Sequence, residues 1–332
     1  MLLVLSAEDA TQARIERKLR ERRVHFERLD PIPLLASGSL QLSWRPGAAR
    51  LIADDRTIDL DEVTSVWVWR PTRTPRVPAH DDATRLKDYA VRESATVLGG
   101  LWQSMAARWT PATPAMIARA EDRLLQLTVA RRAGFAVPES LVTSSIDDAI
   151  RFLETIGRPV VTKAPTDAIA RHFTTELLAF TTPLKACDLA SIDTVRHAPV
   201  LLQERIDKRA ELRVTVVGDR ILAAAIDSQV THHTKDDWRR YELAHTPHRP
   251  CDLPPQVADR CLRVARELGL RYGAIDLILT PGGEYVFLEI NPNGQFGWIE
   301  DRTGLPIAAA LCDELERGGL KRAAAVGSSP PR

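Results

Sequence analysis

The chain opens with apolar and polar segments that alternate at the lengths of strands and helices. Leu2–Leu5 is a short apolar run, residues 8–23 form a charged amphipathic segment, and residues 24–30 (VHFERLD) again fit a strand. A further strand is predicted at Ser65–Trp69, and a long helix at residues 81–108, where apolar residues recur at about helical spacing. The pattern predicts an α/β layer at the N-terminal end.

The closely spaced prolines of WTPATP favour extended backbone, so we expect a first domain at residues 1–112. The next segment contains a helix that ends at Gly134, a residue typical of helix C-caps. A helix at Ile146–Ile156 and the strand PVVTK, which ends at Lys163, follow it. These elements predict a central domain at residues 113–198.

From residue 199 the chain is rich in strands. PVLLQERI, ELRVTVVGDRILAAAI, GAIDLILT and VFLEI fit strands, with the amphipathic helix VADRCLRVARELGL among them. The polar stretch THHTKDDWRRYELAHTPHRP is predicted to be a loop or a lid. We expect a third domain at residues 199–317 and a flexible tail at residues 318–332, which lack an apolar pattern.

Composition and charge limit the classes of binding partner that the chain can have. With 45 basic against 44 acidic residues, the net charge of +1 draws the chain neither to nucleic acid nor to an anionic membrane. The N-terminal apolar run is too short for a signal peptide, and no segment approaches the roughly 18 apolar residues of a membrane span. The four cysteines form no C-x-x-C pair, as expected of reduced thiols. We expect a soluble cytoplasmic protein with a small or peptidic partner.

Two carboxylates and an amide lie on what the sequence predicts to be one hairpin. If the turn of PGGE is centred on its two glycines, antiparallel register places Asp276 opposite Glu289. Asn291 lies two residues beyond Glu289 and therefore on the same face. The same register puts Ile278 and Phe287 on this face, although a three-residue turn would shift the pairing.

Like charges at cross-strand distance, about 4.5–5.5 Å between Cβ atoms, destabilise a hairpin unless a counter-charge meets them. A divalent cation is the simplest counter-charge, and donors that are all oxygen suit Mg²⁺ better than zinc. The alternative is a solvated hairpin whose acidic groups face water. The apolar neighbours on the same face favour the metal site.

Other polar residues in apolar strands fit the phosphates and the base of a nucleotide. Lys163 could contact a phosphate or reach past its strand into solvent. Gln203 and Glu204 could bind an adenine edge or lie at an exposed strand end. Arg213, on the same strand face as Glu211, occupies an unfavourable position for a guanidinium unless an anion or a carboxylate meets it.

In this order the signals resemble the ATP-grasp superfamily and, within it, the graspetide synthetases, which build microviridin-type crosslinked peptides. The resemblance covers residues 115–315 and rests on QLTVARRAGFAVPESLVT, LLQERIDKRAELRVTVVGDRILAAAID, DDWRRY and YGAIDLILTPGGEYVFLEINPNGQFGWIE. It implies an α/β fold of the α+β sandwich type, an ATP-grasp fold with an N-terminal α/β pre-ATP-grasp domain.

The resemblance also implies ATP, two Mg²⁺ ions and a role for each matching position. It implies that Lys163 contacts the α- and β-phosphates, that Gln203, Glu204 and Ile206 frame the adenine, that Glu211 takes the ribose hydroxyls, that Arg213 and Arg239 hold the γ-phosphate and the acyl phosphate, and that Asp276, Glu289 and Asn291 bind the metal.

Three positions depart from the family pattern. Arg123 stands where relatives carry an ATP-binding lysine, which keeps the charge but changes its geometry. The loop that covers the phosphates usually contains glycines in the family, whereas this chain has none between Gly157 and Gly218, so residues 164–182 depart from that pattern. Ligases that add glutamate to protein tails usually carry an asparagine after the matching arginine, whereas here Tyr241 stands two residues after Arg239.

The implied reaction joins two side chains of one ribosomally made precursor peptide. An Asp or Glu of the peptide is activated as an acyl phosphate, and a Ser, Thr or Lys of the same peptide then forms an ester or an amide. The peptide's leader is expected near the N-terminal and central domains, and a homodimer is compatible with this. The alternatives are a ligase that adds an amino acid or small amine to a carboxylate, and a peptide-binding module without catalysis.

Overall fold

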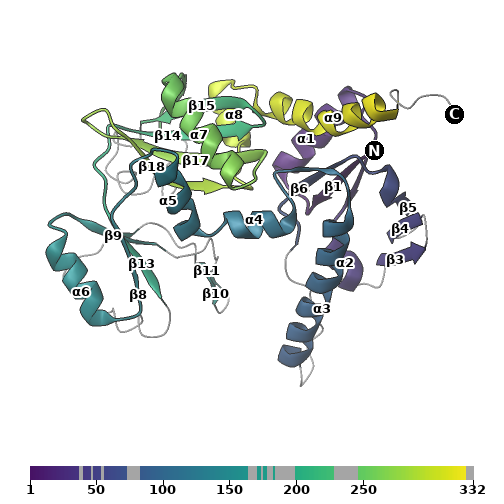
Figure 1. Cartoon of the computed structure of the whole chain (residues 1–332), viewed down its shortest axis with the longest axis horizontal. Helices are drawn as coiled ribbons and strands as arrows, with labels where there is room; N and C mark the ends of the chain where they lie inside the picture. The colour runs from purple at the N-terminus through teal and green to yellow at the C-terminus, as the bar shows by residue number, and fades with distance from the viewer. Residues whose placement is uncertain are drawn as a thin grey trace.

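The computed structural model describes most of the chain. The described residues are 1–36, 40–45, 48–53, 56–72, 83–163, 170–172, 175–177, 182–183, 199–227 and 246–326. Figure 1 places the N-terminal elements at one end and the central and C-terminal sheets at the other, with helix α4 (Pro114–Ala120) between them.

The N-terminal layer is a parallel sheet of order β2-β1-β6-β7, as the alternating pattern predicts. Every residue of β1 and β6 is buried, which is typical of a parallel sheet covered on both faces. The elements of this layer are β1 (Leu2–Ser6), α1 (Ala10–Glu21), β2 (Phe26–Leu29), α2 (Pro31–Ala36), the 3-10 helix η1 (Leu60–Glu62), β6 (Ser65–Trp69), α3 (Ala83–Ser104) and β7 (Arg108–Thr110).

A small antiparallel sheet between β2 and β6 was not expected from the sequence. Its strands are β3 (Leu40–Arg45), β4 (Ala48–Ala53) and β5 (Arg56–Asp59). Leu51 and Ile58 pair across β4 and β5 and are buried in the core of the N-terminal layer. The strands are only 6, 6 and 4 residues long, so the alternation that would have indicated them is brief.

The central region is an antiparallel sheet of order β12-β9-β13-β8 covered by helix α6. The strands PVVTK and PVLLQERI are confirmed, and Lys163 lies opposite Leu201 at the end of β9. The elements are β8 (Ser140–Thr143), α6 (Ile146–Thr155), β9 (Val160–Lys163), β10 (Ala170–His172), β11 (Thr175–Leu177), β12 (Thr182–Pro183) and β13 (Val200–Glu204).

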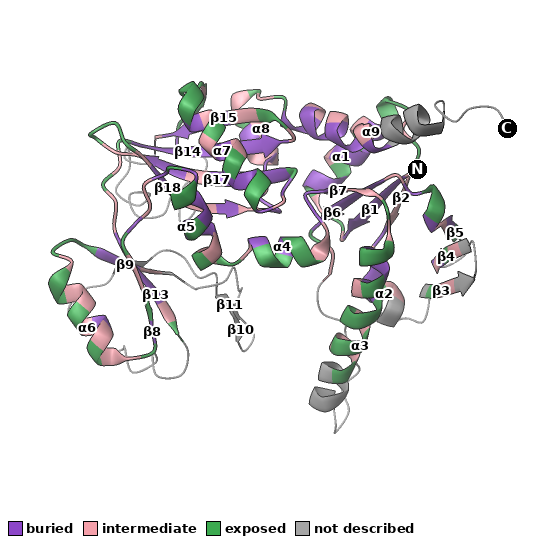
Figure 2. Ribbon diagram, in the orientation of Figure 1, coloured by how far each residue is buried: buried purple, intermediate pink, exposed green. Residues whose placement is uncertain are grey.

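The C-terminal region is a five-stranded antiparallel sheet of order β16-β15-β14-β17-β18. One face packs on α5 and α7, and the other continues into a second core beneath α8 and α9, so the strands are buried over most of their length (Figure 2). The elements are α5 (Arg123–Arg132), β14 (Ala210–Val217), β15 (Arg220–Ile226), β16 (His248–Cys251), α7 (Pro255–Glu267), β17 (Tyr272–Leu279), β18 (Tyr285–Asn291), α8 (Gly297–Thr303) and α9 (Ile307–Val326).

Two expectations about the chain beyond residue 240 were wrong. The predicted loop at residues 231–250 is wrong at its end, because residues 248–250 belong to β16 (His248–Cys251), which pairs with β15; its part up to residue 245 lies outside the described residues. The predicted tail is helical as far as Val326, since α9 packs against β6, β7 and α1 and its alanine-rich end has high helix propensity. Residues 327–332 lie outside the described part of the chain. None of the helices in the described ranges is long and apolar enough to cross a bilayer.

A buried ion pair joins α9 to the N-terminal sheet. Glu314 is 2% exposed and accepts from Arg108 Nη2 at 2.5 Å and from Arg317 Nη1 at 3.2 Å. Beside it, a Cβ atom on Gly318 would lie 2.5 Å from the carbonyl oxygen of Thr64, so the helix backbone touches the sheet directly. The C-terminal helix is therefore part of the N-terminal layer.

We expect Glu314→Gln to lower the free energy of unfolding by about 3–5 kcal/mol, because it leaves Arg108 buried without a counter-charge. Thermal unfolding of the purified protein would measure this as a lower Tm. Asp219→Asn, which breaks an exposed pair with Arg266, is the control and should change the stability by less than about 0.5 kcal/mol. Equal Tm values for the two variants would contradict the role of the buried pair.

Candidate active site

Three charged residues form a row across neighbouring strands of the C-terminal sheet. Arg213 of β14 pairs with Asp276 of β17, which in turn pairs with Glu289 of β18. Arg213 Nη1 donates to Asp276 Oδ1 at 2.9 Å, and Arg213 is 7% exposed. The predicted pairing of Asp276 with Glu289 is confirmed.

The register of the hairpin near its turn differs from the predicted one, although Asp276 still pairs with Glu289. Near the turn, Leu279 pairs with Tyr285 and Leu277 with Phe287, one residue away from the expected register, because the hairpin closes through a three-residue turn. A register shift between Asp276 and Leu277 then restores the expected alignment. Such a bulge adds one residue to one strand and bends it.

The bulge also corrects the predicted position of Phe287. The sequence placed Phe287 on the face of the carboxylates, but the side chain is fully buried in the opposite core, where its ring centroid lies 5.9 Å from that of Phe135. One inserted residue sends the following side chains to the other face. Val286, which pairs with Ile278, takes the place of Phe287 on the carboxylate face.

The counter-charge expected at the carboxylates is present as two guanidinium groups. Arg123, at the first turn of α5, forms a hydrogen-bonded ion pair with Glu289, and Arg213 holds Asp276. Burial acts to lower the pKa of the Arg213 guanidinium, but the charge and hydrogen bond of Asp276 outweigh burial and raise this pKa above its usual value. Arg213 therefore keeps its positive charge inside the sheet.

A tight turn begins at Asn291, where β18 ends. The backbone N–H of Asn293 donates to Asn291 Oδ1 at 2.9 Å, and the carbonyl of Gly294 accepts from the Tyr272 hydroxyl at 2.5 Å. A Cβ atom on Gly294 would lie 2.7 Å from Arg213 Nη2 and 2.5 Å from Ala274 Cβ. Only glycine allows the chain to approach the Arg213 guanidinium this closely.

The residues predicted to frame an adenine lie on β13 and just after it. Gln203 Nε2 donates to Ser140 Oγ at 2.9 Å. Glu204 accepts from the backbone N–H of Glu139 at 3.0 Å and from Arg158 Nη1 at 2.5 Å, so its carboxylate ties three segments of the central sheet together. Ile206 follows in a partly exposed position before β14.

Glu211, predicted to take the ribose hydroxyls, lies at the start of β14 on the side of Arg213. Lys208 Nζ contacts its carboxylate at 2.6 Å, and both side chains are about nine-tenths buried, at 9% and 10% exposure. The spacing of three residues between Lys208 and Glu211 could have indicated this contact. Arg239 and Tyr241, and most of residues 164–182, lie outside the described part of the chain.

The donor set at the row fits a hard cation. Asp276 and Glu289 contribute carboxylate oxygens and Asn291 an amide oxygen, and all three lie on two adjacent strands. Such oxygen sites suit Mg²⁺, which usually takes its other ligands from water and phosphates. Within the described ranges no group of three or more His, Cys, Asp or Glu residues gathers as a metal site, so a cation here would need the amide or a substrate as further ligand.

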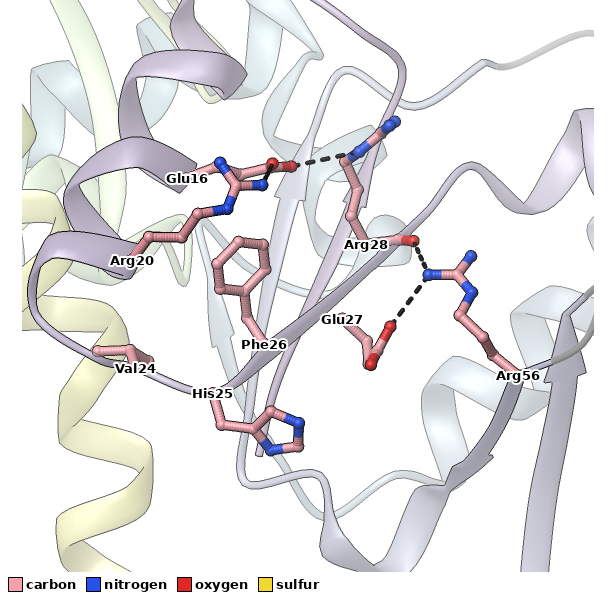
Figure 3. A pocket seen from close by; sticks show the side chains of 8 residues that line it. All are labelled: Glu16, Arg20, Val24, His25, Phe26, Glu27, Arg28 and Arg56. Atoms are coloured by element: carbon pink, nitrogen blue, oxygen red, sulfur yellow. Dashed lines mark hydrogen bonds and ion pairs between the residues drawn. The ribbon is translucent and has the colours of Figure 1, made fainter.

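A cavity of about 460 Å³ lies elsewhere, between α1, β2 and β5 (Figure 3). Its arginines already meet acids that line the same cavity: Arg20 and Arg28 contact Glu16 at 2.6 and 3.2 Å, and Arg56 contacts Glu27 at 3.0 Å. The cations of this cavity are therefore neutralised by acids that line the same cavity.

We expect Gly294→Ala to lower the free energy of unfolding by about 1–3 kcal/mol, since the new methyl group overlaps Ala274 Cβ and the Arg213 guanidinium. Thermal unfolding would report the loss. Gly282→Ala in the hairpin turn is a matched control, because the nearest atom to its added Cβ is 3.8 Å away. A Gly294 variant as stable as the Gly282 variant would show that the close approach is not required.

Solved structures of other proteins resemble the whole chain. The chain is similar to the macrocyclase MdnC of Microcystis aeruginosa MRC, whose crystal structure contains the precursor peptide MdnA, with 28% identity, a TM-score of 0.82, and coverage of 95% of this chain and 99% of that chain. A Chryseobacterium gregarium RiPP-associated ATP-grasp ligase, in complex with ADP and a leader and core peptide, is 27% identical with a TM-score of 0.79 and 95% coverage of each chain.

A relative that is similar in sequence is named a glutamate ligase, whereas the structural relatives above are a macrocyclase and a RiPP-associated ligase. A probable alpha-L-glutamate ligase of Picosynechococcus sp. is 27% identical over 210 residues, which is 62% of this chain and spans only 66% of that relative. The family described as the RimK-like ATP-grasp domain matches residues 120–315, more than half of the chain. The predicted ATP-grasp fold is thereby confirmed, and the chain belongs to the RimK-like ATP-grasp family.

Proposed function

We propose that the protein is an ATP-dependent carboxylate ligase that crosslinks side chains of a ribosomally made precursor peptide. The observation that carries the proposal is the row of Arg213, Asp276 and Glu289, which brings two acids and a buried guanidinium to one face of the sheet. The likeness to a macrocyclase bound with its precursor peptide supports the peptide substrate, because it extends over the N-terminal layer as well.

Each candidate residue has a role in this proposal. Asp276, Glu289 and Asn291 would hold two Mg²⁺ ions, which supply positive charge at the phosphate oxygens. The other roles are those of Lys163 and Arg123 at the α- and β-phosphates, of Gln203, Glu204 and Ile206 around the adenine, of Glu211 at the ribose, and of Arg213 and Arg239 at the γ-phosphate and the acyl phosphate.

The first step activates a carboxylate of the peptide. One carboxylate oxygen attacks the γ-phosphorus of ATP, the bond from this phosphorus to the bridging oxygen breaks, and ADP leaves. Arg213 contributes here because its raised pKa keeps a positive charge near the transferred group, where negative charge spreads over the phosphoryl oxygens. No nucleophilic side chain of the protein is needed.

The second step forms the crosslink. A hydroxyl of Ser or Thr, or an amine of Lys, on the same peptide attacks the acyl carbon and loses a proton. The bond from carbon to the phosphate oxygen breaks and inorganic phosphate leaves. The product is an ester or an amide, and each crosslink removes the elements of one water molecule from the peptide.

A second candidate function is the addition of glutamate or another small amine to a carboxylate. The name of the sequence relative favours it, but that likeness spans only 66% of the relative. A peptide-binding module without catalysis is a third candidate. It fits less well, because a binding module has no need of two acids and a buried arginine on one sheet face.

We expect Glu289→Gln to reduce ADP formation by at least about 100-fold while the fold is retained, because the amide removes one negative charge from the row. ADP release in the presence of peptide substrate is the measurement, with circular dichroism to check folding. Glu284→Gln is the matched control, since Glu284 lies exposed in the turn of the same hairpin. Retained turnover in the Glu289 variant would contradict the assignment.

Mass spectrometry of candidate peptides after incubation with enzyme, ATP and Mg²⁺ separates the three functions. The proposal predicts that a peptide loses the mass of one water for each crosslink. A glutamate ligase would instead add the mass of a glutamyl residue. Unchanged peptide mass without ADP release would favour the binding module.

A further inference from the structure

The strand that carries Glu289 and Asn291 lies at the edge of its sheet, and its outer side is covered in two places. Near its start, the backbone N–H of Phe287 donates to the carbonyl of Ala136 at 2.9 Å, beside an isolated bridge between Ala136 and Val286. Near its end, the side chain of Gln126 takes over. An edge strand would otherwise leave its outward N–H and C=O groups without protein partners.

Gln126 binds both backbone groups of one residue. Its Nε2 donates to the carbonyl of Ile290 at 2.8 Å, and its Oε1 accepts from the N–H of Ile290 at 3.0 Å. A third bond runs from Nε2 to the carbonyl of Ala120, the last residue of α4, at 2.6 Å. Gln126 is 3% exposed, and its side-chain amide thus replaces the neighbouring strand that β18 lacks.

The position of this contact is specific. Ile290 lies between Glu289 and Asn291, two residues beyond Leu288, the extra residue at the register shift of the hairpin. A bulge disrupts the ladder locally, so the backbone just after it is less well fixed by strand pairing alone. Gln126 fixes this part of the strand from the opposite side.

The same helix face also holds the carboxylate. Arg123 lies three residues before Gln126, a spacing that puts both side chains on one side of α5, and Arg123 meets Glu289. Helix α5 therefore contacts the backbone of the strand and one of its acidic side chains at the same time.

We propose that Gln126 is a positioning residue for the cation site: by clamping the Ile290 backbone it aims Glu289 and Asn291 at the face of Asp276. The inference rests on the proposed function, which assigns these three residues to Mg²⁺. Gln126 touches neither nucleotide nor peptide in this scheme, and it acts through the strand.

The test is Gln126→Met, which keeps the volume but removes all three hydrogen bonds. Calorimetric titration with ADP at a series of Mg²⁺ concentrations, well below the Tm of the variant, gives the Mg²⁺ concentration at half-maximal binding. We expect it to rise about tenfold or more, as when a partner of a metal ligand is removed. ADP formation at saturating Mg²⁺ should return toward the wild-type rate, because the ligands themselves are intact.

A purely structural role predicts another result. Glu314→Gln is the matched control. Glu314 lies in α9, beside Gly218 at the far end of β14, so this variant should lower the Tm but leave the Mg²⁺ dependence unchanged. A Gln126 variant that behaves like this control would overturn the proposal. If Gln126→Met does not fold, Gln126→Asn keeps an amide that is too short to reach all three partners, and the same shift is expected of it.

The wild-type protein separates this inference from the proposed function. If wild-type protein binds ADP in a Mg²⁺-dependent way and the Gln126 variants do so at the same Mg²⁺ concentration, only the positioning role fails. If wild-type protein shows no Mg²⁺-dependent binding of ADP, the proposed function fails and the inference fails with it.

Discussion

The pairing of β17 with a strand on each side is the constraint on which the rest of the site depends. It holds Asp276 between Arg213 and Glu289, in a sheet whose other side chains are mostly apolar. Charged groups in such a position are tolerated only when each meets a partner. Moving one ion from water into a protein interior costs on the order of several kcal/mol. Gly294, Arg123 and the bulge in the hairpin all follow from the need to bring these partners together.

The bulge resolves a conflict between the two faces of β18. A regular hairpin with its three-residue turn would send either Phe287 or Glu289 to the wrong side, since neighbouring pairs alternate strictly between faces. With the register shift at Asp276, Phe287 packs in the core and Glu289 faces Asp276. A local irregularity in the ladder thus allows one strand to serve both the core and the charged row.

The turn after the charged row is held from two directions. Tyr272 fixes the carbonyl of Gly294 from within the sheet, at 2.5 Å. Gln295, the next residue, contacts the N-terminal layer, where Thr11 Oγ1 donates to it at 2.5 Å and its Nε2 donates to Asp9 Oδ2 at 3.1 Å. The N-terminal layer therefore contacts the ATP-grasp region directly, at the loop that follows the charged row.

The sequence by itself determined the strands and helices with strong periodicity and the fact that Asp276, Glu289 and Arg213 need partners, because a charge in an apolar run is recognisable locally. It could not determine which groups meet them. Arg123 is 166 residues from Glu289, and Gln126 is 164 residues from Ile290. The bulge, the β3–β5 sheet and the return of α9 to the N-terminal layer were also decided only by tertiary packing, since contacts between distant segments leave no periodic signal in the chain.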